Sequence, residues 1–337
     1  MRPMISAILK RVAMGAITLL GVAIVVFVLL RVAPGNPIAM MIGPGASETD
    51  ILALKAKYGL DQSLPMQFWI WLTNFLQGDF GTSISRQVSV ISLLSERLPA
   101  TLELAIAALV IAVLLGGLIA VLSTLLRKSW GASALDGANS LLLTVPEFVW
   151  ALAFVLLLGV AFPILPLSGR NDPAAGTVFV TNFYLIEAIL TGRWGVVWDV
   201  FSHMLMPVFA LALPLAAIIA RVLKEALGEA MMQDYVVLAR VKGMSERRLV
   251  LGEALRNAVG PTLALTGVQF TFLIGGTVII EKIFSYPGLG NMAIDAVINR
   301  DFPLIQGLIL MFGVLFILIN LAVDLLVVAL NPRLSRG

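Results

Sequence analysis

Long apolar blocks alternate with polar segments along this chain. A helix needs about 20 apolar residues to cross the hydrocarbon core of a bilayer, and it satisfies its own backbone hydrogen bonds there. Six blocks are long enough: residues 12–30, 101–126, 139–161, 204–220, 262–280 and 304–330. The pattern therefore predicts an all-α polytopic membrane protein with six transmembrane helices.

Composition supports this fold class. Of the 337 residues, 59% are hydrophobic and 13% are charged, whereas a soluble domain carries about 25% charged residues. The absence of cysteine excludes disulfides, thiol catalysis and zinc–thiolate sites. His203 is the only histidine, so a metal site has few candidate ligands. This residue is expected to have a capping role at the protein surface. A net charge of +3 indicates no nucleic-acid partner.

Basic residues set the predicted orientation. Arg2, Lys10 and Arg11 precede the first block, which is longer than a signal-peptide core and lacks a following A-x-A-like site. A retained helix is therefore favoured over a cleaved signal. With the N-terminus inside, 14 of the 23 lysines and arginines fall on the cytoplasmic side, and the other nine are spread over longer loops. Both termini are predicted to be cytoplasmic.

The two longer outer segments are expected to contain short helices. In residues 32–100, Ser47 and Asp50 have the spacing of a capping box. The stretch "MQFWIWLTNFL" that follows predicts a helix lying on the outer surface or packed against other helices, and the sequence does not separate these alternatives. In residues 162–203, "FYLIEAILTG" predicts another short surface helix.

A polar stretch, "QDYVVLARVKGMSERRLVLGEALRNAVG", interrupts the apolar pattern at residues 233–260. Gly243 fits a left-handed cap for one helix, and Ser245 fits the start of the next. We expect two helices joined at a glycine in the cytoplasmic loop 221–260. Two functions remain open: a connector bound to anionic lipid through its cations, or a docking element for a cytoplasmic protein.

This stretch resembles the coupling loop of membrane subunits in the dipeptide/oligopeptide/nickel family of ABC importers. The subfamily pattern is D-Y-V-x-x-A-R-x-K-G followed by A-L-R-N-A. The matching residues are Asp234, Tyr235, Val236, Ala239, Arg240, Lys242 and Gly243, and then "ALRNAVGP". The more general pattern of ABC permeases, E-A-A followed by a glycine and I-x-L-P, is matched less well, because residues 253–256 read "EALR".

Eight further stretches resemble family signatures and follow in the expected order along nearly the whole chain. They are "LLRVAPGNP", with Asn36 where the family usually has aspartate, "YGLD", "GDFGTS", "ERLPATLELA", "LPLSGR", "FSYPGLG", "RDFPLIQG" and "NPR". The chain length and the long second outer loop look most similar to the dipeptide-type members, the B-type permease subunits.

The resemblance implies a type I ABC importer permease fold in the bacterial inner membrane. Its expected divisions are residues 1–31 (N-terminus and first helix), 32–100 (outer segment) and 101–337 (five-helix core). The family implies a second related permease subunit, two cytoplasmic ATPases and a soluble binding protein outside. It also implies that Asp234, Tyr235, Ala239, Arg240, Lys242, Gly243, Arg247 and Arg248 contact an ATPase.

The chain itself lacks G-x-x-x-x-G-K-[ST], so ATP and magnesium are expected on the partner ATPases, and this subunit is expected to have no enzymatic activity. A gradient-driven carrier is the alternative, although few ionisable residues lie within the spans. A membrane-embedded enzyme is disfavoured because no nucleophile–histidine pair or paired carboxylates are evident.

Several residues are candidates for the pathway or its gate. Pro146 is expected to kink the third predicted span. Glu147, directly after it, should face protein or a water-filled cavity. Gly275 and Gly276 are expected to permit close helix packing. By resemblance, the turn "SYPGLGN" forms the outer gate and faces the binding protein, with Tyr286, Pro287, Gly288 and Gly290 as its candidate residues.

Overall fold

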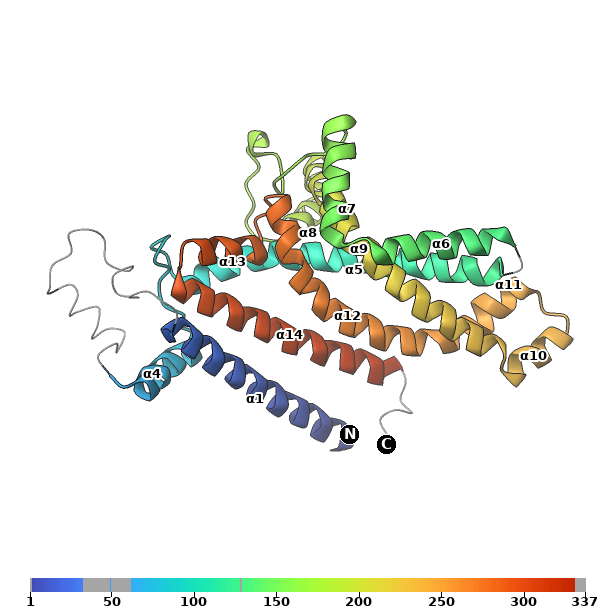
Figure 1. Ribbon diagram of the computed structural model, residues 1–337, viewed down its shortest axis with the longest axis horizontal. Coiled ribbons are helices and arrows are strands. Elements are labelled where there is room, and N and C mark those ends of the chain that lie inside the picture. Colours follow the sequence, from blue (N-terminus) through green and yellow to red (C-terminus); the bar gives the residue numbers. More distant parts are fainter. Residues whose placement is uncertain (1, 33–48, 50–61, 128, 331–337) are drawn as a thin grey trace. The chain divides into compact units, whose positions relative to one another are not determined.

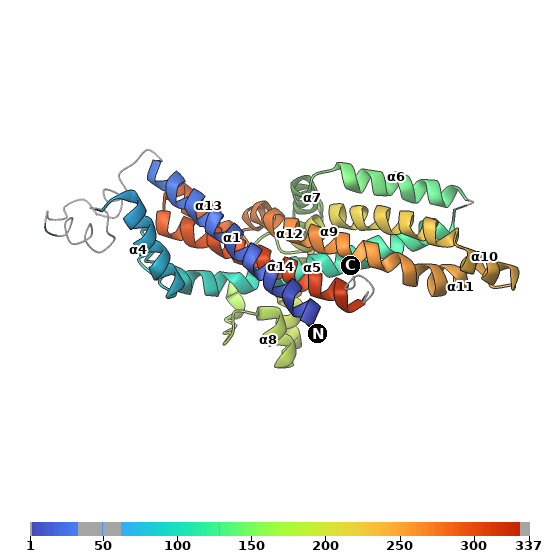
Figure 2. The ribbon, with the colours of Figure 1, turned by 90° about the horizontal axis from the view of Figure 1, so that it is seen from below.

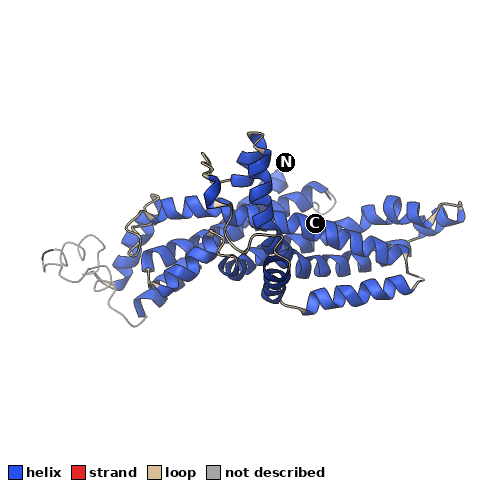
Figure 3. Ribbon diagram, turned by 90° about the horizontal axis from the view of Figure 1, so that it is seen from above, coloured by secondary structure: helices blue, strands red, loops and turns tan. Residues whose placement is uncertain are grey.

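The computed structural model describes residues 2–32, 49, 62–127 and 129–330. Helices dominate this part of the chain (Figure 3). Among the described residues, the one β-type pairing is an isolated bridge between Thr82 and Ser89. The all-α prediction is confirmed. The helix predicted from Ser47 and Asp50 lies outside the described residues, apart from Thr49.

The chain divides into two compact units that are interleaved in sequence. The first comprises Met1–Leu98 and Met292–Leu318, and the second comprises Pro99–Asn291 and Ile319–Gly337. The first unit contains α1 (Arg2–Val32), α4 (Leu64–Leu76), the start of α5 (Val90–Leu125), most of α13 (Leu289–Ile298) and the first part of α14 (Phe302–Leu330).

Aromatic contacts in the first unit decide how α4 is placed. The Phe27 ring on α1 lies 5.3 Å from Phe68 and 5.7 Å from Trp71 on α4, measured between ring centroids. Such aromatic pairs stabilise a packed interface beyond the apolar area they bury. The predicted helix in "MQFWIWLTNFL" is confirmed, and it packs against another helix.

The second unit holds the remaining elements. They are α6 (Trp130–Thr144), α7 (Glu147–Phe154), η1 (Val155–Ala161), η2 (Pro173–Ala175), α8 (Tyr184–Leu190), α9 (Trp194–Met231), α10 (Asp234–Val241), α11 (Glu246–Arg248), η3 (Leu249–Ala254) and α12 (Leu255–Ile283). The short helix predicted in "FYLIEAILTG" is confirmed as α8.

Small side chains allow α5 and α9 to pack closely. A Cβ atom at Gly116 of α5 would lie 2.6 Å from the carbonyl oxygen of Ala216 on α9. Ala108 and Ala112 on α5 and Ala212 on α9 are fully buried in the same apolar core. Backbones approach this closely only where the side chains between them are small.

The third predicted span is broken. α6 and the α7–η1 helix meet at a 99° bend, and Figure 1 shows α7 turning sharply away from α6. Pro146 caps α7, and Val145 before it is extended, with φ −82° and ψ 121°, as steric contact with a proline ring requires. The predicted kink is confirmed, whereas a continuous helix over residues 139–161 is not found. Among the described residues, five helices are long and apolar enough to span a membrane, or six with this bent pair counted as one span.

Candidate functional site

The polar stretch after α9 forms the predicted pair of helices around a glycine. Gly243 has φ +86°. Its N–H donates to the Arg240 carbonyl at 3.0 Å, and the Met244 N–H donates to the Ala239 carbonyl at 3.2 Å. These two hydrogen bonds define a Schellman motif, in which a left-handed glycine ends a helix. The turn therefore directs the chain from α10 into α11 at the ends of α9 and α12 (Figure 2).

A small apolar core anchors this helix pair. Val236 of α10 and Leu249 of η3 are fully buried. They pack with Leu227 of α9, Ala120 of α5 and Ala258 of α12. Buried side chains of this size each contribute about 1.5–3 kcal/mol by leaving water. The pair is therefore fixed to three long helices.

Ion pairs and one polar contact reinforce the anchoring. The Glu246 carboxylate accepts a hydrogen bond from Arg240 Nε at 2.7 Å, and Arg127 Nη2 lies 3.4 Å from it. Asn257 Nδ2 donates to the Tyr235 hydroxyl at 2.8 Å. The charged side chains are a third to a half exposed, and such pairs contribute only about 0–1 kcal/mol each. Their role is to set the orientation of the two helices.

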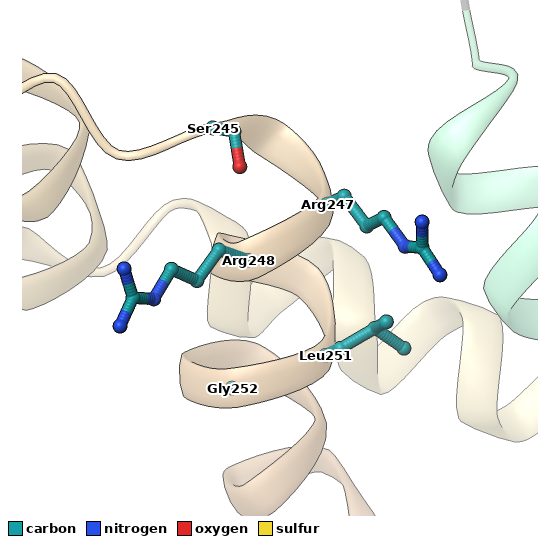
Figure 4. Close-up of a pocket in the computed structure, with 5 residues that line it drawn as sticks. All are labelled: Ser245, Arg247, Arg248, Leu251 and Gly252. Carbon is teal, nitrogen blue, oxygen red and sulfur yellow. The ribbon is translucent and has the colours of Figure 1, made fainter.

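The outward side of this helix pair is apolar and basic. Val237, Leu238 and Val241 on α10 are 44%, 55% and 80% exposed. Beside them, an open recess of about 400 Å³ is lined by Ser245, Arg247, Arg248, Leu251 and Gly252. Figure 4 shows the Arg247 and Arg248 side chains extending from opposite sides of the helix. Exposed apolar side chains together with these two exposed arginines suit an acidic, partly apolar partner surface.

The eight residues predicted for the coupling loop all lie on this helix pair and its turn. Asp234, Lys242, Arg247 and Arg248 are exposed, and Ala239 and Arg240 are half-buried. Tyr235 is 41% exposed. The structure brings these residues onto one short segment.

The turn "SYPGLGN" is built around a residue that the sequence reasoning missed. Glu281, in the last turn of α12, is fully buried. Its carboxylate accepts hydrogen bonds from Thr101 Oγ1 at 2.7 Å and from the Asn291 N–H at 3.0 Å. Thr101 Oγ1 in turn accepts one from the Leu289 N–H at 2.8 Å. The turn therefore closes over a carboxylate and ties the end of α12 to α5.

Two of the predicted gate residues are glycines because the turn lies close to α12. A Cβ atom at Gly288 would lie 2.4 Å from the Glu281 carboxylate, and one at Gly290 would lie 2.4 Å from the backbone Cα of Val278. Such distances are not sustained by real Cβ atoms. Pro287, directly before Gly288, is half-buried. The close approach of the turn to α12 thus requires glycine at both positions.

Tyr286 fills the core beneath the turn. It is fully buried, and burial raises the pKa of its phenol. Nearby, the Arg170 guanidinium donates to Glu103 at 2.6 Å, and both side chains are less than 5% exposed. Arg170 also stacks on the Tyr184 ring at 3.9 Å. Tyr286 is therefore a packing residue in this structure.

Glu147 lies against α12. A Cβ atom at Gly276 would lie 2.8 Å from both Glu147 carboxylate oxygens. The expectation of close packing is therefore confirmed for Gly276. It is wrong for Gly275, whose Cβ would meet nothing within 4 Å. Because the chain bends at Pro146, Glu147 lies in the first turn of α7 rather than in the interior of a straight span.

Further polar pairs were missed because they join signature stretches that are far apart in the sequence. Ser83 of "GDFGTS" donates to the fully buried Asp301 of "RDFPLIQG", as do the hydroxyl and N–H of Ser85 at 2.7 and 3.0 Å. Burial raises the pKa of Asp301, but these hydrogen bonds together outweigh burial and leave the pKa lowered. Likewise, Glu103 of "ERLPATLELA" pairs with Arg170 of "LPLSGR". Both partners stood in stretches already quoted, but one sequence does not show which stretches meet.

Within the described part of the chain, no group of three or more His, Cys, Asp or Glu side chains is arranged to hold a metal ion. His203, expected at the surface, is instead buried, with 2.8 Å between its Nδ1 and the Asp199 carbonyl oxygen.

Comparison with known proteins identifies relatives over the full chain. Residues 112–336 match the family model described as "binding-protein-dependent transport system inner membrane component", and residues 4–105 match the model of its N-terminal part. The di/tripeptide transport system permease DppB of Pseudomonas aeruginosa is 35% identical, with 99% of each chain covered. The glutathione transport system permease GsiC of Salmonella typhi is 34% identical over 98% of this chain. The dipeptide permease DppB of Escherichia coli K12 is 32% identical over 99% of both chains.

A solved structure shares the fold. The MetNI methionine ABC transporter, in an inward-facing crystal form, aligns with a TM-score of 0.53. The alignment covers 72% of this chain and 97% of the other at 17% identity, so it supports the architecture alone. The fold predicted as that of a type I ABC importer permease is confirmed.

Proposed function

The chain belongs to the family of inner-membrane components of binding-protein-dependent transport systems, and we propose that it is a permease subunit of an importer for dipeptides or similar short peptides. The family consists of non-catalytic membrane subunits that work with an ATPase and a substrate-binding protein. Family membership therefore favours ATP-driven transport over the gradient-driven carrier considered from the sequence.

In the proposed assembly, this subunit forms half of the translocation pathway beside a second, related permease subunit. Two ATPase subunits bind ATP and magnesium on the cytoplasmic side, and a binding protein delivers substrate on the outer side. Both termini and the segment carrying α10 and α11 face the cytoplasm, because this orientation places 14 of 23 basic residues inside.

The observation that best supports this role is the anchored helix pair around Gly243. Its inner side is buried against α5, α9 and α12. Its outer side carries exposed apolar residues on α10 beside Arg247 and Arg248. A docking element that transmits force needs such a combination, because the partner must bind one side while the other side is fixed to the spans. A flexible lipid-bound connector needs only the cations.

The substrate class rests on the relatives. Two that cover the whole chain are named for dipeptides or tripeptides, and another for glutathione, which is itself a tripeptide. We infer a short peptide as the cargo. In such systems selectivity resides mainly in the binding protein, so the pathway itself is proposed to accept short peptides of different sequence. Glu147 and residues 285–291 remain candidates for lining or gating it.

Reconstitution tests the proposal. The subunit, its proposed partner permease, the ATPases and the binding protein are placed in proteoliposomes, and ATP-dependent uptake of radiolabelled dialanine is measured. We expect uptake with ATP and none with an imposed ion gradient alone. Deletion of residues 234–248 is expected to abolish uptake, and normal uptake by the deleted protein would exclude the docking role.

A paired substitution separates docking from folding. Arg247→Gln with Arg248→Gln is expected to lower ATP-dependent uptake while leaving the thermal stability of the subunit unchanged. Arg300→Gln is the matched control, since it removes an exposed cation elsewhere in the chain. Equal losses in both variants would indicate a general charge effect rather than docking.

A further inference from the structure

A second hollow lies between α5, α6 and α9, and the proposed function does not use it. Its volume is about 530 Å³. Its polar part is lined by Ser123 of α5, by Asp136, Asn139 and Ser140 of α6, and by Arg221, Lys224 and Glu225 of α9. Aliphatic side chains line the remainder. Figure 1 shows α5, α6 and α9 running side by side here. The hollow is thus amphiphilic, with charged side chains from both α6 and α9.

Both signs of charge are present in equal number. Lys224 Nζ contacts both carboxylate oxygens of Asp136, at 2.5 and 2.6 Å. Arg221 meets Glu225 through Nε at 3.4 Å, which leaves the two terminal nitrogens of its guanidinium without an ion pair in the described part of the chain. Two cations and two carboxylates sum to no net charge. A ligand of a single charge sign would therefore meet repulsion as well as attraction.

Two buried polar atoms in the lining have no hydrogen-bond partner among the described residues. They are Ser123 Oγ and Asn139 Oδ1, and Ser123 is only 1% exposed. Asn139 Nδ2 donates to the Ala217 carbonyl at 3.2 Å, and this contact fixes which end of the amide is the oxygen. The lining thus retains an unused hydroxyl donor and an unused carbonyl acceptor. Buried polar groups in folded proteins are normally satisfied, by protein, water or ligand.

We propose that this hollow binds a zwitterion that carries a primary ammonium and an anionic group a few bonds apart. The ammonium lies toward Asn139 Oδ1 and Glu225, and the anionic group lies toward Ser123 and Arg221. Two sources have this chemistry: the headgroup of phosphatidylethanolamine, whose acyl chains would follow the aliphatic wall, and a short peptide. Neither source requires the proposed transport function, so failure of the uptake experiment would leave this inference standing.

The test uses the full chain, purified in detergent, and native mass spectrometry of its bound lipid. We expect phosphatidylethanolamine to bind about tenfold more tightly than phosphatidylcholine, a ratio that corresponds to about 1.4 kcal/mol. The trimethylated ammonium of choline has no N–H to donate. Phosphatidylglycerol, which lacks the ammonium, is expected to bind as weakly as phosphatidylcholine. This comparison needs no mutant and therefore does not depend on whether a variant folds.

Variants then locate the site. Ser123→Ala and Arg221→Gln are each expected to reduce the preference for phosphatidylethanolamine. Arg248→Gln is the matched control, because it removes an equivalent charge from the recess beside α11. Equilibrium dialysis with radiolabelled dialanine forms the second arm. Dialanine binding that Ser123→Ala abolishes, without a preference for phosphatidylethanolamine, would assign the hollow to a peptide.

Three results would overturn the proposal. One is equal binding of the three lipids together with no binding of dialanine. Another is a preference for phosphatidylethanolamine that Arg248→Gln reduces as much as Arg221→Gln does. The third is tighter binding of phosphatidylglycerol, which would assign the hollow to a purely anionic ligand.

Discussion

Two turns in this protein contain glycine and differ in why they need it. At Gly243 a Cβ atom would meet nothing within 4 Å, and the backbone has φ +86°. At Gly288 and Gly290, φ is not in the left-handed region, but a Cβ would lie 2.4 Å from neighbouring atoms. The first turn therefore needs a backbone conformation, and the second needs space.

The difference matches what surrounds each turn. The Gly243 turn projects beyond the long helices with one side free, so that a partner can reach it. The turn at residues 285–291 closes over the buried Glu281 carboxylate and the buried Tyr286 ring. A substitution in the exposed turn is thus expected to change docking more than stability. A substitution in the buried turn is expected to change stability first.

The largest expected effect is in the buried region, at the Glu103–Arg170 ion pair. Removing one partner leaves an unpaired buried charge, so Arg170→Met is expected to reduce the free energy of unfolding by about 3–5 kcal/mol. Unfolding in mixed micelles, followed by circular dichroism, measures this. Arg193→Met is the control, because the Arg193–Glu187 pair is partly exposed. Equal losses in the two variants would show that burial does not distinguish these pairs.

The next largest effect is expected for Gly290→Ala, which should reduce the free energy of unfolding by about 3 kcal/mol through overpacking. The obstacle is backbone, the Cα of Val278, so it cannot rotate away. Gly275→Ala, in the interior of α12, has open space at its Cβ and is expected to raise stability by about 0.5–1 kcal/mol. The same unfolding measurement serves both, and a neutral Gly290→Ala would refute the steric account of the turn.

Gly243→Ala is expected to reduce the free energy of unfolding by a smaller amount, about 1 kcal/mol, because an alanine is strained in the left-handed region. Gly243→Asn is expected to lose less, since asparagine tolerates this conformation better. Uptake in the reconstituted system is expected to fall in both variants, and to fall further in Gly243→Ala than in Gly243→Asn. If both variants transport normally, the turn geometry is not needed for coupling.

The smallest effect is expected for Glu246→Gln, at about 0–1 kcal/mol, because its ion pairs with Arg240 and Arg127 are exposed. Raising the salt concentration is expected to reduce this difference further, since salt screens exposed charges. Unfolding at two ionic strengths checks it. A loss above about 2 kcal/mol, independent of salt, would show that the helix pair is held by charge rather than by its apolar core.

The sequence predicted some of these features better than others. The apolar periodicity placed the long helices, and the glycine with its flanking residues placed the turn between α10 and α11. The sequence did not predict a role for Glu281, which stands in an apolar helix. Nothing near it in the sequence indicates that Thr101, 180 residues away in the chain, donates to its carboxylate. It also treated Gly275 and Gly276 as equivalent, although only one faces another helix.

What the sequence determined by itself is the set of properties that depend on local chemistry. These are the membrane class, the helix-breaking effect of Pro146, the left-handed turn at Gly243 and the family signatures. Tertiary structure alone decided which signatures meet: Ser83 with Asp301, Glu103 with Arg170, and Thr101 with Glu281. The physical reason is that hydrogen bonds and ion pairs act over a few ångströms of space, and distance along the chain does not specify which groups come within that range.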